Sequence, residues 1–255
     1  MMVKSGIGRA FGGLLRGLML GGAAALLSGC GLFGGPSEEF RYRLTVEVET
    51  PGGMKSGSSV IEVRAVKNSD WLTPEARGHR YSFKGEAVAV DLPGGRTLFA
   101  LLKMDAGGDN VDEIPWHVFA DRIADTRDPL EQMRIMRAWK DTAQGGIVVP
   151  PTRQEYYYKN GKRIDRAVSN YPMLVTFTDI PDPKSVARVE PDNLTAAFGP
   201  GVTLKRITVQ VTDDEVTKGI EKRLGWLDHL EDYRTDRKNP FTGTLPREIG
   251  GLRSK

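Results

Sequence analysis

Residues 40–50 read FRYRLTVEVET, and apolar side chains alternate with polar ones along the whole stretch. On an extended chain, every second residue falls on the same face. This period of two, together with the β-branched and aromatic residues, predicts a β-strand with one buried face. The residues of that face are Phe40, Tyr42, Leu44, Val46 and Val48.

Further strands are predicted beyond the turn residues that follow this stretch. Pro-Gly-Gly comes directly after the first strand and occurs again at residues 93–95, which indicates two hairpins. We expect a long hairpin loop at residues 51–57. A strand at residues 96–104 is apolar on both faces, so it should be central in its sheet. The other strands are predicted at residues 58–67, 81–92, 147–149, 153–159, 162–167, 171–178 and 202–212.

A first amphipathic helix is predicted at residues 128–143. Asp128 is a suitable N-cap, Pro129 suits the first helical position, and Glu131 has the capping-box spacing. We expect residues 111–125 to be helical after Pro115.

A second amphipathic helix is predicted at residues 213–232. Thr212 and Glu215 have the capping-box spacing, and an apolar stripe follows at helical intervals. The stripe consists of Val216, Ile220, Leu224, Leu227 and Leu230. The fold class is therefore α+β, mainly antiparallel β-sheet built from hairpins or a meander, with two amphipathic helices packed on it.

The domain prediction is one β-rich globular domain over residues 38–232. The alternative is two halves, 38–104 and 147–232, joined by the helical region between them. Residues 233–255 are charged and show no periodicity, so we expect a flexible tail.

The N-terminal residues have the three parts of an export signal. Lys4, Arg9 and Arg16 form a basic start, an uncharged run follows at residues 17–27, and small residues precede Cys30. The run of 11 residues would extend roughly 16 Å as a helix. A bilayer core requires about 20 residues, so a cleaved signal is expected.

The sequence Leu26-Leu27-Ser28-Gly29-Cys30 resembles the lipobox of bacterial lipoproteins. The resemblance implies a signal peptide at residues 1–29, lipidation of the Cys30 thiol, and cleavage before Cys30. It also implies a lipid-anchored protein of the cell envelope that faces the periplasm. Gly31, where members kept at the inner membrane often have Asp, favours the outer membrane. An uncut membrane anchor and a soluble exported protein remain as alternatives.

A short tether at residues 30–37 would join the lipid to the folded body and keep that body close to the membrane. The chain has 36 Lys and Arg and 33 Asp and Glu. Removing the three basic residues of the signal leaves 33 of each sign, so the mature chain is neutral. We expect no nucleic-acid partner and no polybasic patch. Cys30 is the only cysteine, so the body has no disulfide.

Candidate catalytic, metal and cofactor sites are weak in the sequence. Asp109, Asp112, Glu113 and His117 could ligate a divalent cation, but their spacing matches no ligand pattern, and we expect an exposed acidic loop. The serines in residues 55–59 lack a nucleophile motif and are assigned to a flexible hairpin loop. Gly29, Gly31 and Gly34 fit the dinucleotide string without its strand and helix, so no cofactor is implied.

The aromatic residues are candidates for a binding surface. Tyr156 and Tyr158 should share one face of a strand and Tyr157 the other, before a type I′ turn at Asn160-Gly161. Exposed aromatic rings bind flat ligands and protein partners. Trp71 and Trp116 are further candidates. Core and cross-strand packing is the expectation, and a binding surface is the alternative.

Two histidines and one glycosylation string have simpler interpretations. His229 would be a solvated cation near the C-terminus of the second predicted helix, and His79 would lie in a loop. Asn193-Leu194-Thr195 fits the glycosylation string, which a bacterial signal makes irrelevant.

The function hypothesis is a membrane-anchored envelope lipoprotein that is a non-enzymatic binding or structural module. Its partners would be the membrane, through the lipid on Cys30, and an envelope protein or cell-wall component. One alternative is a module that binds envelope ligands through exposed aromatic residues. Another is a hydrolase whose site is assembled only in three dimensions.

Overall fold

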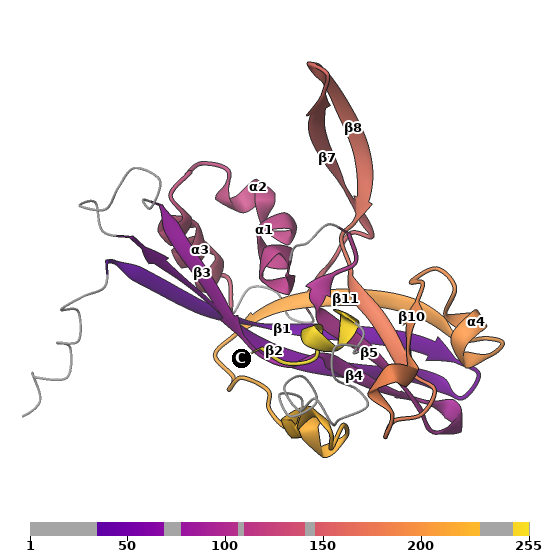
Figure 1. Cartoon of the computed structure of the whole chain (residues 1–255). Coiled ribbons are helices and arrows are strands. Elements are labelled where there is room, and N and C mark those ends of the chain that lie inside the picture. Colours follow the sequence, from indigo (N-terminus) through magenta and orange to yellow (C-terminus); the bar gives the residue numbers. More distant parts are fainter. Residues whose placement is uncertain (1–34, 69–77, 107–109, 141–145, 230–246, 255) are drawn as a thin grey trace, which may run out of the picture.

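The computed structural model describes residues 35–68, 78–106, 110–140, 146–229 and 247–254 (Figure 1). The chain forms two antiparallel sheets and a separate hairpin, so the α+β class with mainly antiparallel sheet is confirmed. The first sheet consists, in spatial order, of β3 (His79–Lys84), β2 (Gly53–Lys67), β1 (Ser37–Thr50), β11 (Thr203–Thr212) and β6 (Ile147–Val148). The second consists of β10 (Val186–Val189), β9 (Pro172–Phe177), β5 (Arg96–Met104) and β4 (Val88–Leu92). The hairpin consists of β7 (Thr152–Lys159) and β8 (Lys162–Ser169).

Strand β1 is the centre of the first sheet, as its alternating sequence predicts. It pairs with β2 on one side and β11 on the other, and Tyr42 lies between Ile61 and Val211. All five apolar residues predicted for one face are buried. The opposite face carries arginine, threonine and glutamate side chains, which are partly or fully exposed to solvent.

The main core lies between the two sheets and below the helices. It joins the apolar face of β1 to side chains of β4 and β5, including Val90 and Leu98. Gly57 of β2 allows the close approach of β4, because a Cβ on Gly57 would lie 2.0 Å from the carbonyl oxygen of Ala89. The first hairpin also differs from the prediction, since β2 already begins at Gly53 and no long loop exists at residues 51–57.

The helices cover one end of the first sheet. They are α1 (Ile114–Val118), α2 (Ala120–Ile123) and α3 (Pro129–Ala138), preceded by the 3-10 turn η3 (Val111–Glu113). In α3 the Asp128 side chain accepts a hydrogen bond from Leu130 N at 3.0 Å, which confirms the predicted cap. Met133 and Met136 are buried against the core. Glu131 pairs with Arg134 instead of closing a capping box.

The single strand predicted at residues 81–92 is wrong, because the chain changes sheets within it. Strand β3 ends at Lys84 in the first sheet and β4 starts at Val88 in the second. The corner is held by partners distant in sequence. Ala87 N donates to the carbonyl of Leu252 at 2.8 Å, and the Glu86 backbone bridges to Arg253.

The helix predicted at residues 213–232 is also wrong within its described part, residues 213–229. Only the 3-10 turns η5 (Ile220–Lys222) and η6 (Leu227–His229) form there. The buried carboxylate of Glu86 accepts hydrogen bonds from Gly219 N at 3.0 Å and Ile220 N at 2.9 Å. Gly219 has a φ of 119°, which interrupts a helix. Ile220, Leu224 and Leu227 of the apolar stripe are buried, but in short turns, and Val216 is only half-buried. Leu230 lies outside the described residues.

The flexible tail predicted at residues 233–255 is wrong for residues 247–254; residues 233–246 lie outside the description. The 3-10 turn η7 (Arg247–Gly251) places Ile249 and Leu252 in a second core. This second core covers the outer face of β5 and β9, and β5 is therefore buried on both faces as predicted. Its members include Phe99, Leu101, Val175, Phe177, Ile220, Leu224, Trp226, Leu227, Ile249 and Leu252.

The remaining elements follow the predictions closely. Strands β6, β9 and β11 form where expected, and the helical turn near Leu194 is α4 (Leu194–Phe198). The 3-10 turn η4 (Pro183–Ser185) and β10 precede it. Strands from residues 38–104 and 147–232 are hydrogen-bonded to each other within both larger sheets. In the described ranges, every helix is too short or too polar to serve as a membrane span.

We expect Leu252→Ala to destabilise the fold by about 2–5 kcal/mol, because Leu252 is fully buried in the second core. Leu252→Met, which conserves volume, should cost less than about 1.5 kcal/mol. Urea denaturation of both variants measures this difference. A loss below 1 kcal/mol for Leu252→Ala would contradict the packing of the C-terminal segment.

Glu62 of β2 joins three strands on the outer face of the first sheet. Its carboxylate accepts from Arg41 of β1 at 2.9 Å and Lys84 of β3 at 3.1 Å. Burial alone would raise the pKa of Glu62, but the hydrogen bonds and charges of these two cations outweigh burial and lower the pKa. A lowered pKa stabilises the fold above the unfolded value, about 4.3, and this stabilisation disappears as the pH falls through the folded value.

We therefore expect Glu62→Gln to be less stable than the wild type at pH 7, with the gap closing as the pH is lowered below about 4. Urea denaturation at a series of pH values measures the gap. Glu215→Gln, at an exposed carboxylate, is the control and should give a curve parallel to that of the wild type. A gap for Glu62→Gln that stays constant with pH would refute the assignment.

Candidate functional site

The β7–β8 hairpin, residues 152–169, projects away from both sheets as an arm (Figure 1). Its base is fixed to the body. Asn170 N donates to the carbonyl of Pro151 at 3.0 Å, and Arg153 donates to the carbonyl of Ser169 at 3.0 Å. Val168 and Asn170 are buried there. Beyond this base, β7 and β8 form a two-stranded sheet that is separate from both larger sheets.

The tip of the arm is the predicted tight turn. Asn160 and Gly161 have φ values of 53° and 74°, the positive values that a type I′ turn requires. Lys159 lies opposite Lys162 across the turn. This pairing fixes the register of the whole arm and therefore decides which side chains share a face.

The three tyrosines are exposed, so the expectation of core packing is wrong. The exposed fractions of Tyr156, Tyr157 and Tyr158 are 60%, 44% and 68%. Their predicted division between two faces is confirmed, since Tyr156 and Tyr158 contact each other edge to face at 6.2 Å. The rings remain exposed because the arm leaves the body rather than packing on a sheet.

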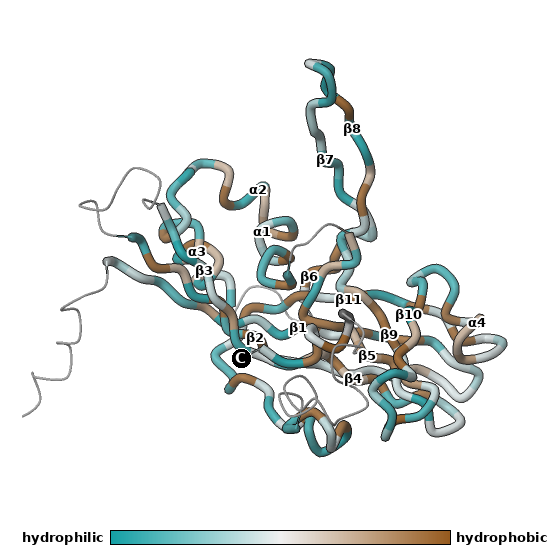
Figure 2. Tube along the Cα trace, in the orientation of Figure 1, coloured by the Kyte–Doolittle hydropathy of each residue, from teal (hydrophilic) through white to brown (hydrophobic). Residues whose placement is uncertain are grey.

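The register gives the arm two different faces. The tyrosine face has one positive and one negative side chain, and the basic face has four positive and one negative. The tyrosine face contains Gln154, Tyr156, Tyr158, Arg163 and Asp165. The basic face contains Arg153, Glu155, Tyr157, Lys159, Lys162, Ile164 and Arg166. Figure 2 shows hydrophilic colours along most of the arm, whereas hydrophobic colours are more frequent around β5 and β9.

Arginines hold two of the tyrosine rings. The guanidinium carbon of Arg163 lies 4.4 Å from the ring centre of Tyr156, and Arg163 also bonds to Asp165 at 2.8 Å. On the basic face, the guanidinium of Arg166 lies 5.6 Å from the ring centre of Tyr157. Such cation–π contacts order side chains that would otherwise rotate freely.

Glu155 offsets part of the positive charge near the base of the basic face. It forms ion pairs with Arg153 and Arg166. Burial alone would raise the pKa of Glu155, but the hydrogen bond from Arg166 and the charge of Arg153 lower the pKa overall. The carboxylate is therefore ionised at neutral pH. The lysines at the tip have no such acidic partner among the described residues, so the positive charge is concentrated at the tip.

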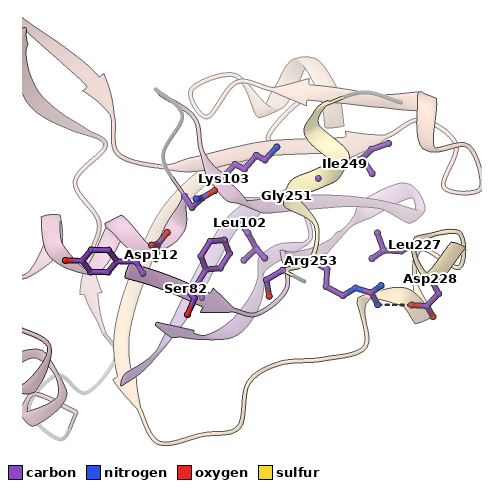
Figure 3. Close-up of a pocket in the computed structure, with 14 residues that line it drawn as sticks. Ser82, Leu102, Lys103, Asp112, Leu227, Asp228, Ile249, Gly251 and Arg253 are labelled. Carbon is purple, nitrogen blue, oxygen red and sulfur yellow. Dashed lines mark hydrogen bonds and ion pairs between the residues drawn. The ribbon is translucent and has the colours of Figure 1, made fainter. Parts of the chain in front are cut away.

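A second candidate is a concave region of about 840 Å³ beside the C-terminal segment (Figure 3). Its polar lining includes Ser82, Lys103, Asp112 and Arg253. Arg253 points toward Asp228 and bonds to it at 2.8 Å. Among the described residues, Ser82 forms no hydrogen bond to a histidine or carboxylate that could activate it. The described residues that line this region therefore do not place Ser82 beside a base, as the hydrolase alternative would require.

Tyr81 at the edge of this region has a raised pKa. Partial burial is the larger cause, and the negative charges of Glu113 and Asp112 contribute further. A phenol with a raised pKa is a hydrogen-bond donor at neutral pH, not a nucleophile. Its ring packs edge to face on Trp116 at 6.0 Å.

The candidate metal ligands do not assemble in the described part of the chain. Asp112 and Glu113 lie in η3 and His117 in α1, while Asp109 lies outside the described residues. No group of three or more His, Cys, Asp or Glu residues is suited to hold a metal within the described ranges.

The serines of residues 55–59 lie in strand β2, so the expectation of a flexible loop is wrong. Ser59 is buried and donates to the carbonyl of Glu86 at 2.7 Å. Asn193, the first residue of the glycosylation string, caps α4, because its side chain accepts a hydrogen bond from Ala196 N.

The histidines and tryptophans have structural roles where they are described. His79 opens β3 and lies 3.9 Å from the Asp128 carboxylate. The helix-dipole interpretation of His229 is wrong, because that residue ends the short turn η6. Trp116 packs on Phe40 at 5.9 Å. Trp71 and Cys30 lie outside the described residues.

The sequence analysis missed the basic face of the arm. The arm is locally basic although the mature chain as a whole is neutral, because five of the seven charged residues at positions 152–169 are positive. The signal was present in the sequence. The Asn160-Gly161 turn fixes the register of the hairpin and therefore which residues share a face. The charges on each face can then be counted from the sequence, and they distinguish the basic face from the tyrosine face.

Comparison with known proteins adds no functional assignment. No protein-family model, curated protein sequence or solved structure matches the chain. The arm is therefore the leading candidate site on geometric grounds alone, because it combines exposed aromatic rings with sorted charge.

We expect the body to fold without the arm. Arg153 and Val168 form a cross-strand pair of the same kind as Lys159 and Lys162, so Asn-Gly can replace residues 154–167 as a two-residue turn. The thermal unfolding midpoint should change by no more than about 4 °C, measured by circular dichroism. A cooperative transition that disappears would show that the arm is part of the core instead.

Proposed function

We propose that this chain is a lipid-anchored protein of the bacterial cell envelope that acts by binding, with the β7–β8 arm as its binding element. The arm carries the proposal, because a hydrogen-bonded base presents three exposed tyrosines and two tip lysines without an ion pair to any described residue. Tyrosine and arginine are the residue types enriched where proteins bind their partners.

The anchor half of the proposal is supported by the lipobox-like sequence and by the short separation in sequence between Cys30 and the first described strand. Strand β1 starts at Ser37, so the tether over residues 30–37 would reach at most about 28 Å. A multiply acylated Cys30 would satisfy the need for more than one acyl chain in stable anchoring. The body would then face the periplasm at the membrane surface, with the outer membrane favoured by Gly31.

The second candidate is a binding module for neutral envelope ligands such as glycans. The tyrosine face favours it, because Tyr156 and Tyr158 lie together with little net charge. Aromatic rings pack on the apolar faces of flat ligands. Binding of this kind would be insensitive to salt and would be lost in Tyr158→Ala, which separates it from an electrostatic role of the tip.

We expect Cys30→Ala to abolish incorporation of labelled palmitate into the protein, because the thiol is the only lipid acceptor that the lipobox offers. Gly31→Ala, which keeps the thiol, is the matched control and should remain labelled. Mass spectrometry of the wild type should show an acylated chain beginning at Cys30. An unmodified full-length wild-type chain in the cytosolic fraction would exclude the lipid anchor.

A further inference from the structure

The tip of the arm contains an unfavourable charge pair. Lys159 and Lys162 lie directly opposite each other on the basic face. Like charges in this arrangement destabilise a hairpin. Arg153 and Arg166 both form ion pairs with Glu155, and Arg163 pairs with Asp165, whereas neither lysine has an ion pair with a described residue. An anionic partner at the tip would relieve this repulsion.

Aromatic rings flank the same tip on both faces. Tyr158, which directly precedes Lys159 in the sequence, lies on the tyrosine face. Tyr157 lies on the basic face, opposite Ile164. Tyrosine has an apolar ring and a polar hydroxyl, so it concentrates where membrane headgroups meet the hydrocarbon. Lysine side chains beside it can extend toward anionic headgroups.

We propose that the arm tip, residues 157–163, inserts into the headgroup layer of an anionic phospholipid bilayer. The two lysines bind the lipid phosphates, and the rings of Tyr157 and Tyr158 lie at the depth of the headgroups. The inference rests on the proposed role of the arm as a binding element, and it names the partner of that element.

A bilayer fits the tip better than a protein surface does. The charge that remains unpaired belongs to lysines, which are depleted at protein interfaces, and not to the arginines, which are enriched there. The tip is also exposed on both faces, as a projection that enters a fluid layer must be. The expected anchor at Cys30 would hold the body at a membrane surface.

The test is binding of the full chain to vesicles, in a Cys30→Ala background so that no acyl chain contributes. One set contains phosphatidylglycerol and phosphatidylcholine in equal parts, and the other contains phosphatidylcholine alone. Each lysine near an anionic surface contributes about a fivefold gain. The tip variant Lys159→Glu/Lys162→Glu should therefore bind the anionic vesicles at least about tenfold more weakly, and the difference should vanish at high salt.

The control is Lys55→Glu/Lys222→Glu, which makes the same change in net charge at exposed positions of the body. It should bind at least several times more tightly than the tip variant. Equal binding of the two double variants would overturn the proposal. Circular dichroism should be unchanged for both, since all four side chains are exposed.

A second variant tests insertion of the rings. Tyr157→Ser/Tyr158→Ser should weaken binding to both kinds of vesicle at high salt, where only apolar burial remains. Binding equal to that of the parent chain would overturn the insertion step. If the tip variants impair a cellular phenotype while vesicle binding is unchanged, the arm serves a protein partner instead. Failure of lipidation alone would be seen in the palmitate experiment and would leave the vesicle result intact.

Discussion

The structure depends on the single buried face of β1. This strand is paired on both sides, and its apolar side chains all point in one direction. Burying them requires a second layer on that side only, and the four-stranded sheet and the helices provide it together. The other face of the first sheet carries charged groups such as Glu62, which form ion pairs between strands. Thr217 covers part of this face and exchanges hydrogen bonds with the backbone of Val60.

Features set by neighbouring residues could be predicted from the sequence. The alternation of β1, the Asp128 cap of α3 and the Asn160-Gly161 turn each depend on a few adjacent positions, and all three are confirmed. The class of fold follows from them, because antiparallel hairpins with one apolar face must pack face to face.

Features set by distant partners could not be predicted. The stripe at residues 216–230 fits a helix by spacing, but the Glu86 carboxylate binds the backbone of Gly219 and Ile220 across more than 130 residues. In the same way, the identity of the three tyrosines was visible in the sequence and their exposure was not. Exposure follows from the direction in which the arm leaves the body, and Asn170 and Pro151 set that direction at its base.

The C-terminal segment determines when the fold can be completed. Residues 252–254 bind the corner at residues 85–87, where the chain crosses between sheets, with a separation of 169 positions between Gly85 and Ser254. Contacts this distant form late. A ribosome delivers the chain from its amino end, so the second core stays open until residues 249–254 have been synthesised.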